Sequence, residues 1–251
     1  MVERPAVLVT GGARRIGAAI ASAFGAAGWH VVIHYGTSGV EAEALAASLP
    51  SAETVRANLA GQGAAAALGQ QLANRLSDWR VLVNCASVFE LDYATELAPG
   101  VFRRAMQINA AAPAALAQAY LSHGRASGGR RVIQITDQKI ANPNPDFFSY
   151  TMSKHALNAT IAMLSMARSD PRDRIYGLAP GAILASHDQA EVETERSHRM
   201  NLLVRKTGAD EIAQATLFLA QGWLRSGETL YIDSGQHLLS QPRDVLFLAR
   251  Q

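Results

Sequence analysis

The sequence predicts an α/β fold in one domain: a doubly wound, seven-stranded parallel sheet flanked by helices. Short aliphatic runs recur along the 251 residues, and alanine-rich helical patterns separate them. The runs are continuous instead of alternating, which is typical of strands buried on both faces. The segments between them are long enough for the crossover connections that parallel neighbours require. Because no repeat or linker divides the chain, residues 1–251 are expected to form a single domain.

The expected strands follow one another at regular spacing. In chain order they contain Ala6 to Val9, Val31 to Ile33, Thr54 to Val55, Val81 to Val83, Val132 to Ile135, Ile175 to Leu178 and Leu230 to Ile232. Two segments do not follow this alternation of strand and helix patterns. Residues about 185–205, rich in Glu, His and Arg, are expected to form either a solvated surface helix or a flap over a substrate cleft. The tail, about 236–251, extends past the last strand and is expected to cover a neighbouring subunit's site.

Composition excludes several classes of function. The formal net charge of +2 is spread along the chain, which argues against a nucleic-acid partner. The lone Cys85 cannot form an internal disulfide, and the first residues lead directly into a strand without a secretory signal, so we expect a cytoplasmic protein. No apolar run reaches the roughly 20 residues of a membrane helix. The histidines have no metal-ligand spacing, and no metal is expected.

A glycine-rich turn follows the first strand. Thr10-Gly-Gly-Ala-Arg-Arg-Ile-Gly17 connects that strand to a helical pattern. Glycines allow the backbone to approach a pyrophosphate closely, and the following helix presents free N–H groups. The context of a strand before and a helix after predicts a Rossmann-type dinucleotide site.

The end of the second strand indicates which dinucleotide binds there. NAD sites carry an acid at this point to hold the ribose 2′-hydroxyl. Here the segment after Tyr35 has no carboxylate, whereas Arg14, Thr37 and Ser38 could bind a 2′-phosphate through charge-assisted hydrogen bonds. We therefore predict NADP(H) as the cofactor.

A tyrosine and a lysine occur one helical turn apart, at Tyr150 and Lys154. An i, i+4 pair lies on one face of a helix, so both groups can point into one site. A nearby cation is expected to lower the pKa of the phenol, which would suit Tyr150 to act as a general acid. Lysine is scarce in this chain, and Lys139, Lys154 and Lys206 are the three examples.

Together, the glycine turn and the Tyr150/Lys154 pair resemble the short-chain dehydrogenase/reductase family over nearly the full chain. Further matching segments are Asn84-Cys-Ala-Ser87, Asn109, Pro180-Gly181 and Asn58-Leu59, the last with Asn in place of the family's Asp. The resemblance implies that Asn109 anchors a proton-relay water. It implies cofactor contacts from Gly11, Arg14, Arg15, Ile16, Gly17, Tyr35, Thr37, Ser38, Asn58, Leu59, Asn84, Cys85, Ala86, Ser87, Tyr150, Lys154, Pro180 and Gly181.

Two departures narrow the resemblance. Arg15 stands where most members have the middle glycine, and Asp137 stands where most have a catalytic serine. These changes, together with Phe89, are similar to the pteridine reductases and the bacterial dihydromonapterin reductases within the family. That similarity implies that Phe89 stacks on a pterin against the nicotinamide, and that Arg15 and Ser87 contact pterin or cofactor phosphate. Asp137 and Tyr150 are then expected to bind substrate as well as catalyse.

Physical chemistry favours the same substrate class. An ionised Asp137 would repel the alkoxide that forms when a ketone is reduced. A pterin instead presents N–H donors that a carboxylate accepts, and its C=N bonds need a proton at nitrogen. The leading hypothesis is an NADPH-dependent pteridine reductase using Asp137, Tyr150, Lys154 and Asn109. Two alternatives stay open: a carbonyl or 3-oxoacyl reductase in which Asp137 is protonated, and a non-catalytic dinucleotide sensor.

Family members usually assemble as tetramers through two long helices. The corresponding segments here are roughly Gly100 to Tyr120 and Phe148 to Ala167, both rich in alanine on one side. Such surfaces suit close packing across a two-fold axis. A homotetramer is therefore expected.

Overall fold

A computed structural model describes residues 4–185 and 189–251. Its sheet has seven parallel strands in the order β3-β2-β1-β4-β5-β6-β7. Their bounds are β1 (Ala6–Val9), β2 (His30–Tyr35), β3 (Ala52–Arg56), β4 (Trp79–Asn84), β5 (Arg131–Ile135), β6 (Arg174–Pro180) and β7 (Thr229–Ile232). Each expected aliphatic run lies within one strand, and the predicted doubly wound fold is confirmed.

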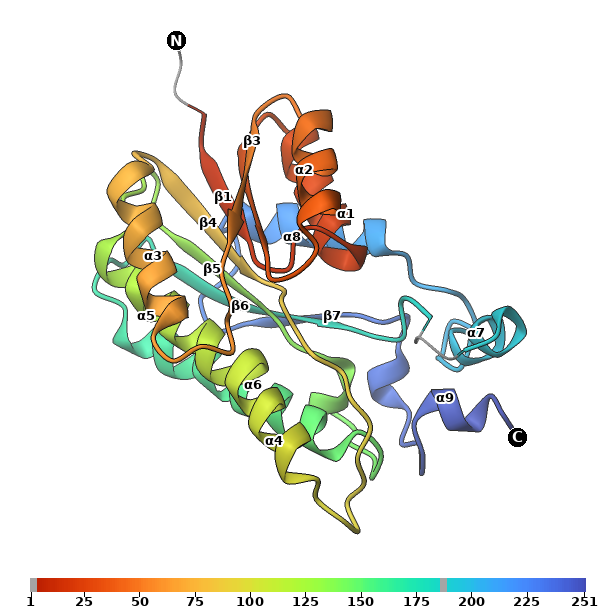
Figure 1. The fold of residues 1–251 in the computed structure, drawn as a ribbon. Coiled ribbons are helices and arrows are strands. Elements are labelled where there is room, and N and C mark those ends of the chain that lie inside the picture. Colours follow the sequence, from red (N-terminus) through yellow and green to blue (C-terminus); the bar gives the residue numbers. More distant parts are fainter. Residues whose placement is uncertain (1–3, 186–188) are drawn as a thin grey trace.

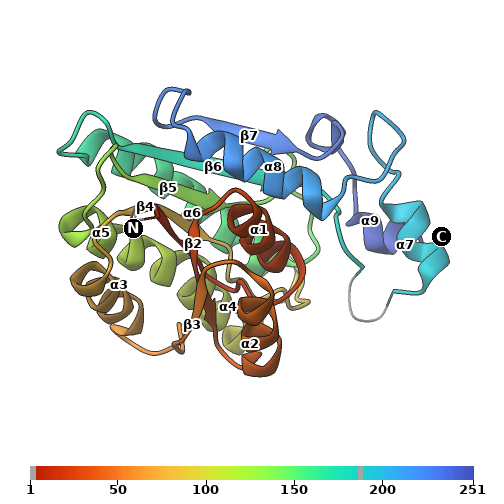
Figure 2. The same ribbon diagram turned by 90° about the horizontal axis from the view of Figure 1, so that it is seen from above.

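Helices cover both faces of the sheet (Figures 1 and 2). One face carries α1 (Arg15–Ala26), α2 (Gly39–Ser48) and α8 (Ala209–Ala220), and the other carries α3 (Ala64–Arg75), α5 (Ala112–His123) and α6 (Phe148–Ala167). Two apolar cores result. Ile20 and Phe24 belong to the first and Leu72 and Leu116 to the second, all fully buried. Strands buried on both faces explain why the sequence runs are continuous.

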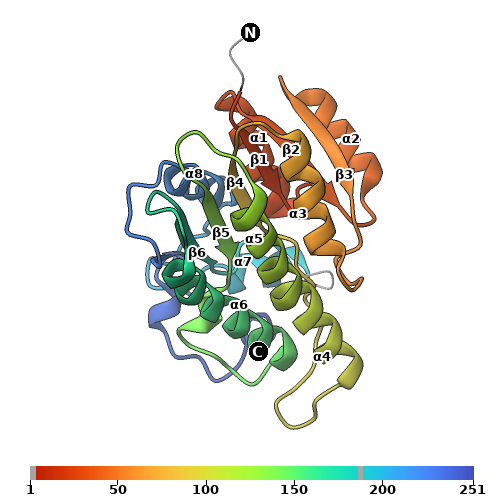
Figure 3. The ribbon, with the colours of Figure 1, turned by 90° about the vertical axis from the view of Figure 1, so that its left-hand side faces the viewer.

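The segment predicted as one helix from Gly100 to Tyr120 is helical throughout, but its middle part is irregular. It consists of α4 (Pro99–Met106), a π-helical turn η1 (Gln107–Ala111) and α5, which follow one another in line (Figure 3). Pro113, near the start of α5, has no N–H to donate to the carbonyl of Asn109 four residues earlier. The local widening into a π turn accommodates that missing hydrogen bond.

Four short elements lie beyond the carboxyl ends of the strands. They are η2 (Gln138–Ile140), α7 (Glu191–Ser197), η3 (Gln236–Leu238) and α9 (Val245–Leu248). Figure 1 shows α7 and α9 together past the end of β7, close to the C-terminus. The expected flap, 185–205, contains α7, while its residues 186–188 lie outside the described chain. No helix in the described residues is long and apolar enough to cross a membrane.

Candidate active site

A cavity of about 560 Å³ opens at the carboxyl ends of the strands. Parallel α/β sheets bind ligands at this edge, where the strand order reverses between β1 and β4. Most of the residues expected in the site line it: Gly11, Arg14, Arg15, Ile16, Gly17, Cys85, Ala86, Ser87, Phe89, Asp137, Tyr150, Lys154, Pro180 and Gly181. Residues from the two ends of the sequence therefore meet in one place.

The glycine turn has no room for side chains at two positions. Gly11 has a φ of 62°, and a Cβ there would lie 2.9 Å from Cα of Ala86. A Cβ on Gly17 would lie 2.1 Å from the carbonyl oxygen of Gly11. Thr10 Oγ1 accepts hydrogen bonds from the N–H groups of Cys85 (2.9 Å) and Ala86 (3.1 Å), which joins the turn to the loop after β4. The turn is thus tightly closed beneath the first residues of α1.

The first turn of α1 presents a positive end to the cavity. The helix has no side-chain cap and no acidic residue in its first turn. Free N–H groups and the helix dipole favour a bound phosphate there. The residues present therefore fit the pyrophosphate of a dinucleotide, as the sequence predicts.

His34, near the end of β2, forms a hydrogen bond that stabilises the glycine turn. Its Nδ1 accepts a hydrogen bond from the Gly11 N–H (3.1 Å), and its Nε2 lies 3.1 Å from the carbonyl oxygen of Ala57. These partners require the proton to be on Nε2 in a neutral ring. Burial lowers the pKa of His34 below its ordinary value, against the opposing effect of the Ala57 hydrogen bond.

The region expected to hold a 2′-phosphate is open and has one basic side chain. Arg14 is exposed and lies 3.8 Å from Glu41 of α2, a long and solvent-exposed ion pair of little energetic weight. Thr37 is exposed and Ser38 is half-buried at the start of α2. No carboxylate stands at the end of β2. This arrangement fits the prediction of NADP(H).

Arg15 forms hydrogen bonds to protein at the cavity wall. Its guanidinium donates to the backbone carbonyls of Leu184 (3.4 Å) and Ala185 (3.1 Å), in the loop after β6. Its backbone has a φ of 55°, in the left-handed region where glycine is usual. Arg15 thereby joins the glycine turn to the start of the expected flap, and its expected contact with a phosphate or a pterin stays a prediction.

Asp137 and Tyr150 form a hydrogen-bonded pair at the cavity wall. The Tyr150 hydroxyl donates to Asp137 Oδ2 over 2.7 Å, and the Lys139 N–H donates to Oδ1 over 2.9 Å, so Asp137 also caps η2. Burial raises the pKa of Asp137 above its ordinary value. The two hydrogen bonds and the charges of Lys139 and Lys154 act in the opposite direction.

The pKa of Tyr150 corrects our expectation. Lys154 was predicted to lower it, whereas burial and then the charge of Asp137 raise it well above the ordinary value. The ammonium of Lys154 donates to the carbonyl of Ile135 over 2.8 Å and lies 5.6 Å from the centre of the Tyr150 ring. Burial lowers the pKa of Lys154 itself. Tyr150 therefore holds its proton firmly and presents it to a carboxylate.

Asn109 lies behind the cavity and does not line it. Its amide holds the backbone N–H of Val88 (2.8 Å) and the carbonyl of Val88 (2.9 Å), and it donates to Ser153 Oγ over 3.0 Å. The side chain thereby ties the loop that carries Phe89 to α6. The expected contact with a relay water stays a prediction.

Phe89 belongs to an aromatic cluster at the mouth of the site. Its ring stacks on Phe147 with centroids 4.0 Å apart and meets Tyr150 edge-on at 4.7 Å. It is 40% exposed and lines the cavity. One face of the ring is therefore already covered by protein, and a pterin could use only the other.

Seven expected residues lie outside the cavity lining: Tyr35, Thr37, Ser38, Asn58, Leu59, Asn84 and Asn109. The first five lie at the end of β2 or in the loops after β2 and β3, where an extended dinucleotide could contact them. Asn84 is buried and donates to the carbonyl of Pro113 (3.1 Å) and to Gln134 (2.9 Å), so its role in this structure is to join β4, β5 and α5.

Sequence reasoning missed most of the far wall of the cavity. It is formed by Gln138 and Lys139 of η2, by Gln189, Ser197 and His198 near α7, and by Gln236, Asp244, Val245 and Leu246 of the tail. The tail, expected over a neighbouring subunit, lies over the site of its own chain. Its apolar spacing was visible in the sequence, but only the path of the backbone after β7 decides where it packs. Within residues 4–185 and 189–251 no cluster of His, Cys, Asp and Glu could hold a metal ion.

Comparison with known proteins identifies the family. Residues 11–237 match the family described as enoyl-(acyl carrier protein) reductase. The chain therefore belongs to the short-chain dehydrogenase/reductase family, and the resemblance seen in the sequence is confirmed. It is an oxidoreductase of that family.

Relatives with different substrates match at similar levels. The structure of FolM alternative dihydrofolate reductase 1 from Brucella suis in complex with NADP is 33% identical, with a TM-score of 0.88, and the match covers 96% of this chain and 98% of that one. Pteridine reductase 1 of Leishmania tarentolae is 26% identical over 93% of this chain and 96% of its own. The 7α-hydroxysteroid dehydrogenase of Escherichia coli K12 is 27% identical over 91% and 92%.

Proposed function

We propose that this protein is an NADPH-dependent reductase of a pteridine. The observation that carries the proposal is the hydrogen bond of 2.7 Å between Tyr150 and Asp137 inside the cavity. It joins a proton donor to an acceptor that most family members lack. Relatives named as a pteridine reductase and an alternative dihydrofolate reductase, the latter with NADP bound, support both substrate and cofactor.

NADPH, when bound, would supply a hydride at the nicotinamide. The N-terminus of α1 would hold the pyrophosphate, and Arg14 with Thr37 and Ser38 would hold the 2′-phosphate. Pro180 and Gly181 would border the nicotinamide, where a Cβ on Gly181 would lie 2.6 Å from Gln236 Oε1.

Tyr150 and Asp137 would have different roles at the substrate. Tyr150 would give its phenolic proton to a ring nitrogen. Its raised pKa opposes this step, so the phenolate that forms needs stabilisation by a nearby cation. Asp137, as a carboxylate, would accept a hydrogen bond from an N–H of the pterin and hold the pterin ring parallel to the Phe89 ring. Lys154 would neutralise the phenolate as it forms, since its ammonium lies on the face of the Tyr150 ring.

Substrate preference tests the proposal directly. NADPH oxidation is followed with dihydrobiopterin, dihydromonapterin, simple diketones and a quinone. We expect turnover of a dihydropterin, and we expect Asp137→Ser to lower its kcat/KM by about 10²-fold, the usual contribution of a proton-transfer residue. The exposed Asp170→Ser variant is the control. Exclusive turnover of the diketones would reject the pteridine, and tight NADPH binding without any turnover would favour a dinucleotide sensor.

Carbonyl reduction is a second candidate, favoured by one observation. Burial raises the pKa of Asp137, and a protonated carboxyl can donate to a ketone oxygen as a serine hydroxyl does. The two functions predict opposite pH dependences on this group. Ketone reduction through protonated Asp137 would rise as pH falls, whereas pterin reduction through ionised Asp137 would decline, so the slope of kcat/KM on the acid side separates them.

A further inference from the structure

Lys139 connects the catalytic carboxylate to the C-terminal tail. Its backbone N–H donates to Asp137 Oδ1, while its ammonium lies 2.7 Å from Asp244 Oδ2 and donates to Asn144 Oδ1 over 2.9 Å. The side chain is almost completely buried beside the Phe147 ring. A lysine at this depth is uncommon unless it is paired.

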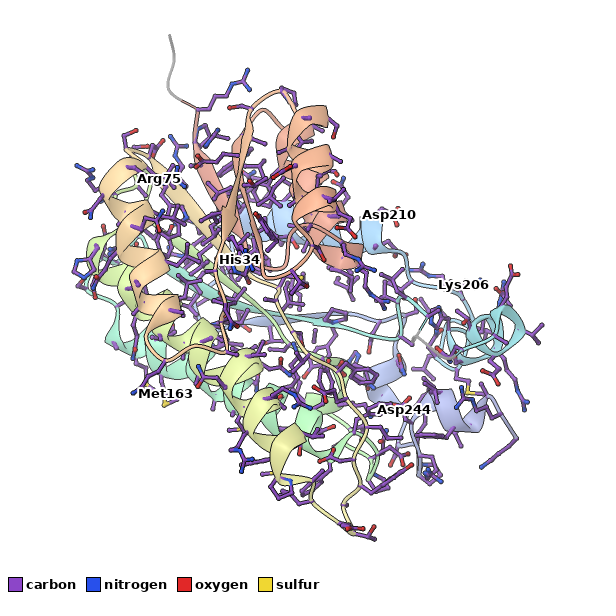
Figure 4. The ribbon with its side chains drawn as sticks, viewed as in Figure 1. His34, Arg75, Met163, Lys206, Asp210 and Asp244 are labelled. Atoms are coloured by element: carbon purple, nitrogen blue, oxygen red, sulfur yellow. The ribbon has the colours of Figure 1, made fainter. Side chains whose placement is uncertain are left out.

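Asp244 is held in place by the tail and by the loop before α6. Its Oδ1 caps α9 by accepting the Leu246 N–H over 2.9 Å, and its own N–H donates to Asp146 Oδ2 over 2.8 Å. Arg243 pairs with the same Asp146 at 2.8 Å. The tail is therefore fixed over the site by charged contacts, and Asp244 itself lines the cavity. Figure 4 shows Asp244 beside α9.

Titratable groups face the Asp137–Tyr150 pair from the surrounding elements. Lys139 comes from η2, Lys154 from α6, Asp244 from the tail and Cys85 from the loop just after β4. The ammonium groups favour an ionised Asp137, while the charge of Asp244 acts against ionisation of Tyr150. Because the groups are buried, solvent screens these effects weakly.

We propose that Lys139 is a positioning residue that keeps Asp137 ionised beside Tyr150, and that Asp244 of the tail moderates its effect by holding the ammonium group. This inference deepens the proposed function, on whose assignment of Asp137 it rests. It gives the tail a role in the proton chemistry of its own subunit's site. Neither residue touches the reacting atoms, so both act through Asp137.

Two single variants should shift the pKa of Asp137 in opposite directions if the proposal is correct, and two further variants serve as checks. Lys139→Met removes a cation and leaves Asp244 unpaired, so the pKa of Asp137 should rise. Asp244→Asn removes a negative charge and leaves the cation, so the pKa of Asp137 should fall. The double variant should lie between the two. Lys139→Arg keeps the charge and should behave like the wild type.

The pKa of Asp137 can be measured without any substrate. Protein labelled with ¹³C at aspartate carboxyls is titrated by NMR, and the Asp137 resonance is assigned by its absence in Asp137→Asn. The matched control is Lys206→Met, an exposed lysine that pairs with Glu195 of α7 (Figure 4) and is not among the charges that act on Asp137. It should leave the Asp137 titration unchanged.

A kinetic measurement adds the functional consequence. With the substrate found in the panel, Lys139→Met should lower kcat/KM at pH 7 by about tenfold and move the acid limb of the pH profile upward, since less Asp137 is ionised at a given pH. Asp244→Asn should move the same limb downward. Lys139→Arg should stay within about twofold of the wild type.

The outcomes separate this inference from the proposed function. Opposite shifts in the titration support it even if no pteridine is turned over. If Lys139→Met and Asp244→Asn move the Asp137 titration in the same direction, or leave it unchanged, the inference is overturned even if pterin activity is found. Should Lys139→Met not fold, the downward shift expected for Asp244→Asn decides alone, and its absence would be equally decisive.

Discussion

Burial and neighbouring groups together set the pKa values of single residues in this site. Burial and then Asp137 raise the pKa of Tyr150, and burial also raises the pKa of Asp137 against the opposing effect of two hydrogen bonds and two nearby ammonium groups. A buried pair of this kind titrates as a unit. The residue that most family members replace by serine thus changes what the neighbouring tyrosine can do.

We propose that cofactor preference depends on Arg14, the exposed basic side chain beside the end of β2. Loss of a charge-assisted hydrogen bond to a 2′-phosphate corresponds to roughly tenfold in affinity. Arg14→Ala should therefore raise KM for NADPH by about tenfold or more and change KM for NADH little. Initial-rate kinetics with both cofactors measure this, with the exposed Arg103→Ala as control. Equal effects on the two cofactors would contradict the assignment.

His34 should make stability depend on pH. Its pKa in the folded protein lies below the ordinary value of 6.5, so the unfolded chain binds the proton more readily. Its contribution is therefore complete above pH 6.5 and is lost as the pH falls below that value. Thermal unfolding between pH 8 and 5 should show a smaller acid-side loss of Tm in His34→Gln than in the wild type.

The exposed His123→Gln variant provides the comparison, since His123 lies at the solvent end of α5. It should retain the acid-side loss of the wild type. Identical pH dependence in all three proteins would show that the contact between Gly11 and the His34 ring does not depend on a neutral imidazole.

Elements are joined at their amino ends by a buried ion pair far from the cavity. Asp173, just before β6, is fully buried and accepts from the backbone and the guanidinium of Arg130, just before β5, at 2.8 and 2.5 Å. The ion pair thereby joins the amino ends of β5 and β6, on the side of the sheet opposite the site. The glycine turn lies at the carboxyl end of β1, beside the site. The buried ion pair and the candidate active site therefore lie at opposite ends of the strands.

Removing one partner of this pair should be costly. Asp173→Asn leaves the guanidinium of Arg130 without its counter-charge, and the free energy of unfolding should fall by about 3 kcal/mol. Chemical denaturation measures the loss. Asp170→Asn nearby, which affects an exposed pair with Arg172, should change the midpoint very little. A similar midpoint for both variants would mean that the buried pair adds no net stability.

At the scale of the whole molecule, α6 presents an unusual surface. Met152, Met163 and Met166 lie on it at helical spacing and are 39%, 55% and 78% exposed in the single chain. Figure 4 places Met163 on the outer face of that helix. Exposed methionines grouped in this way are typical of contact surfaces. The proposed homotetramer would cover them.

Analytical ultracentrifugation should give a mass about four times the 26.8 kDa of the chain. Met163→Glu with Met166→Glu should reduce that mass, because burying carboxylates in an apolar contact is unfavourable. Val40→Glu, at an equally exposed position on α2, should leave the mass unchanged. A monomeric wild type would remove the tetramer proposal.

The positions of the strands along the chain, the glycine turn and the Tyr150/Lys154 pair could all be predicted from the sequence, because each depends on local spacing. Continuous aliphatic runs require a sheet covered on both sides, and glycines between a strand and a helix require a close backbone approach. The absence of a serine thirteen residues before Tyr150 was equally visible. Asp137 could therefore be assigned to the site before its surroundings were known.

Tertiary structure alone decided how these groups affect one another. Burial and the charge of Asp137 raise the pKa of Tyr150, opposite to the expected direction. Arg15 donates to two carbonyls of a distant loop, and Asp244 pairs with Lys139 across 105 positions of sequence. Spacing along a chain fixes which face a side chain occupies, but burial, distance and charge pairing exist only after remote segments have packed together.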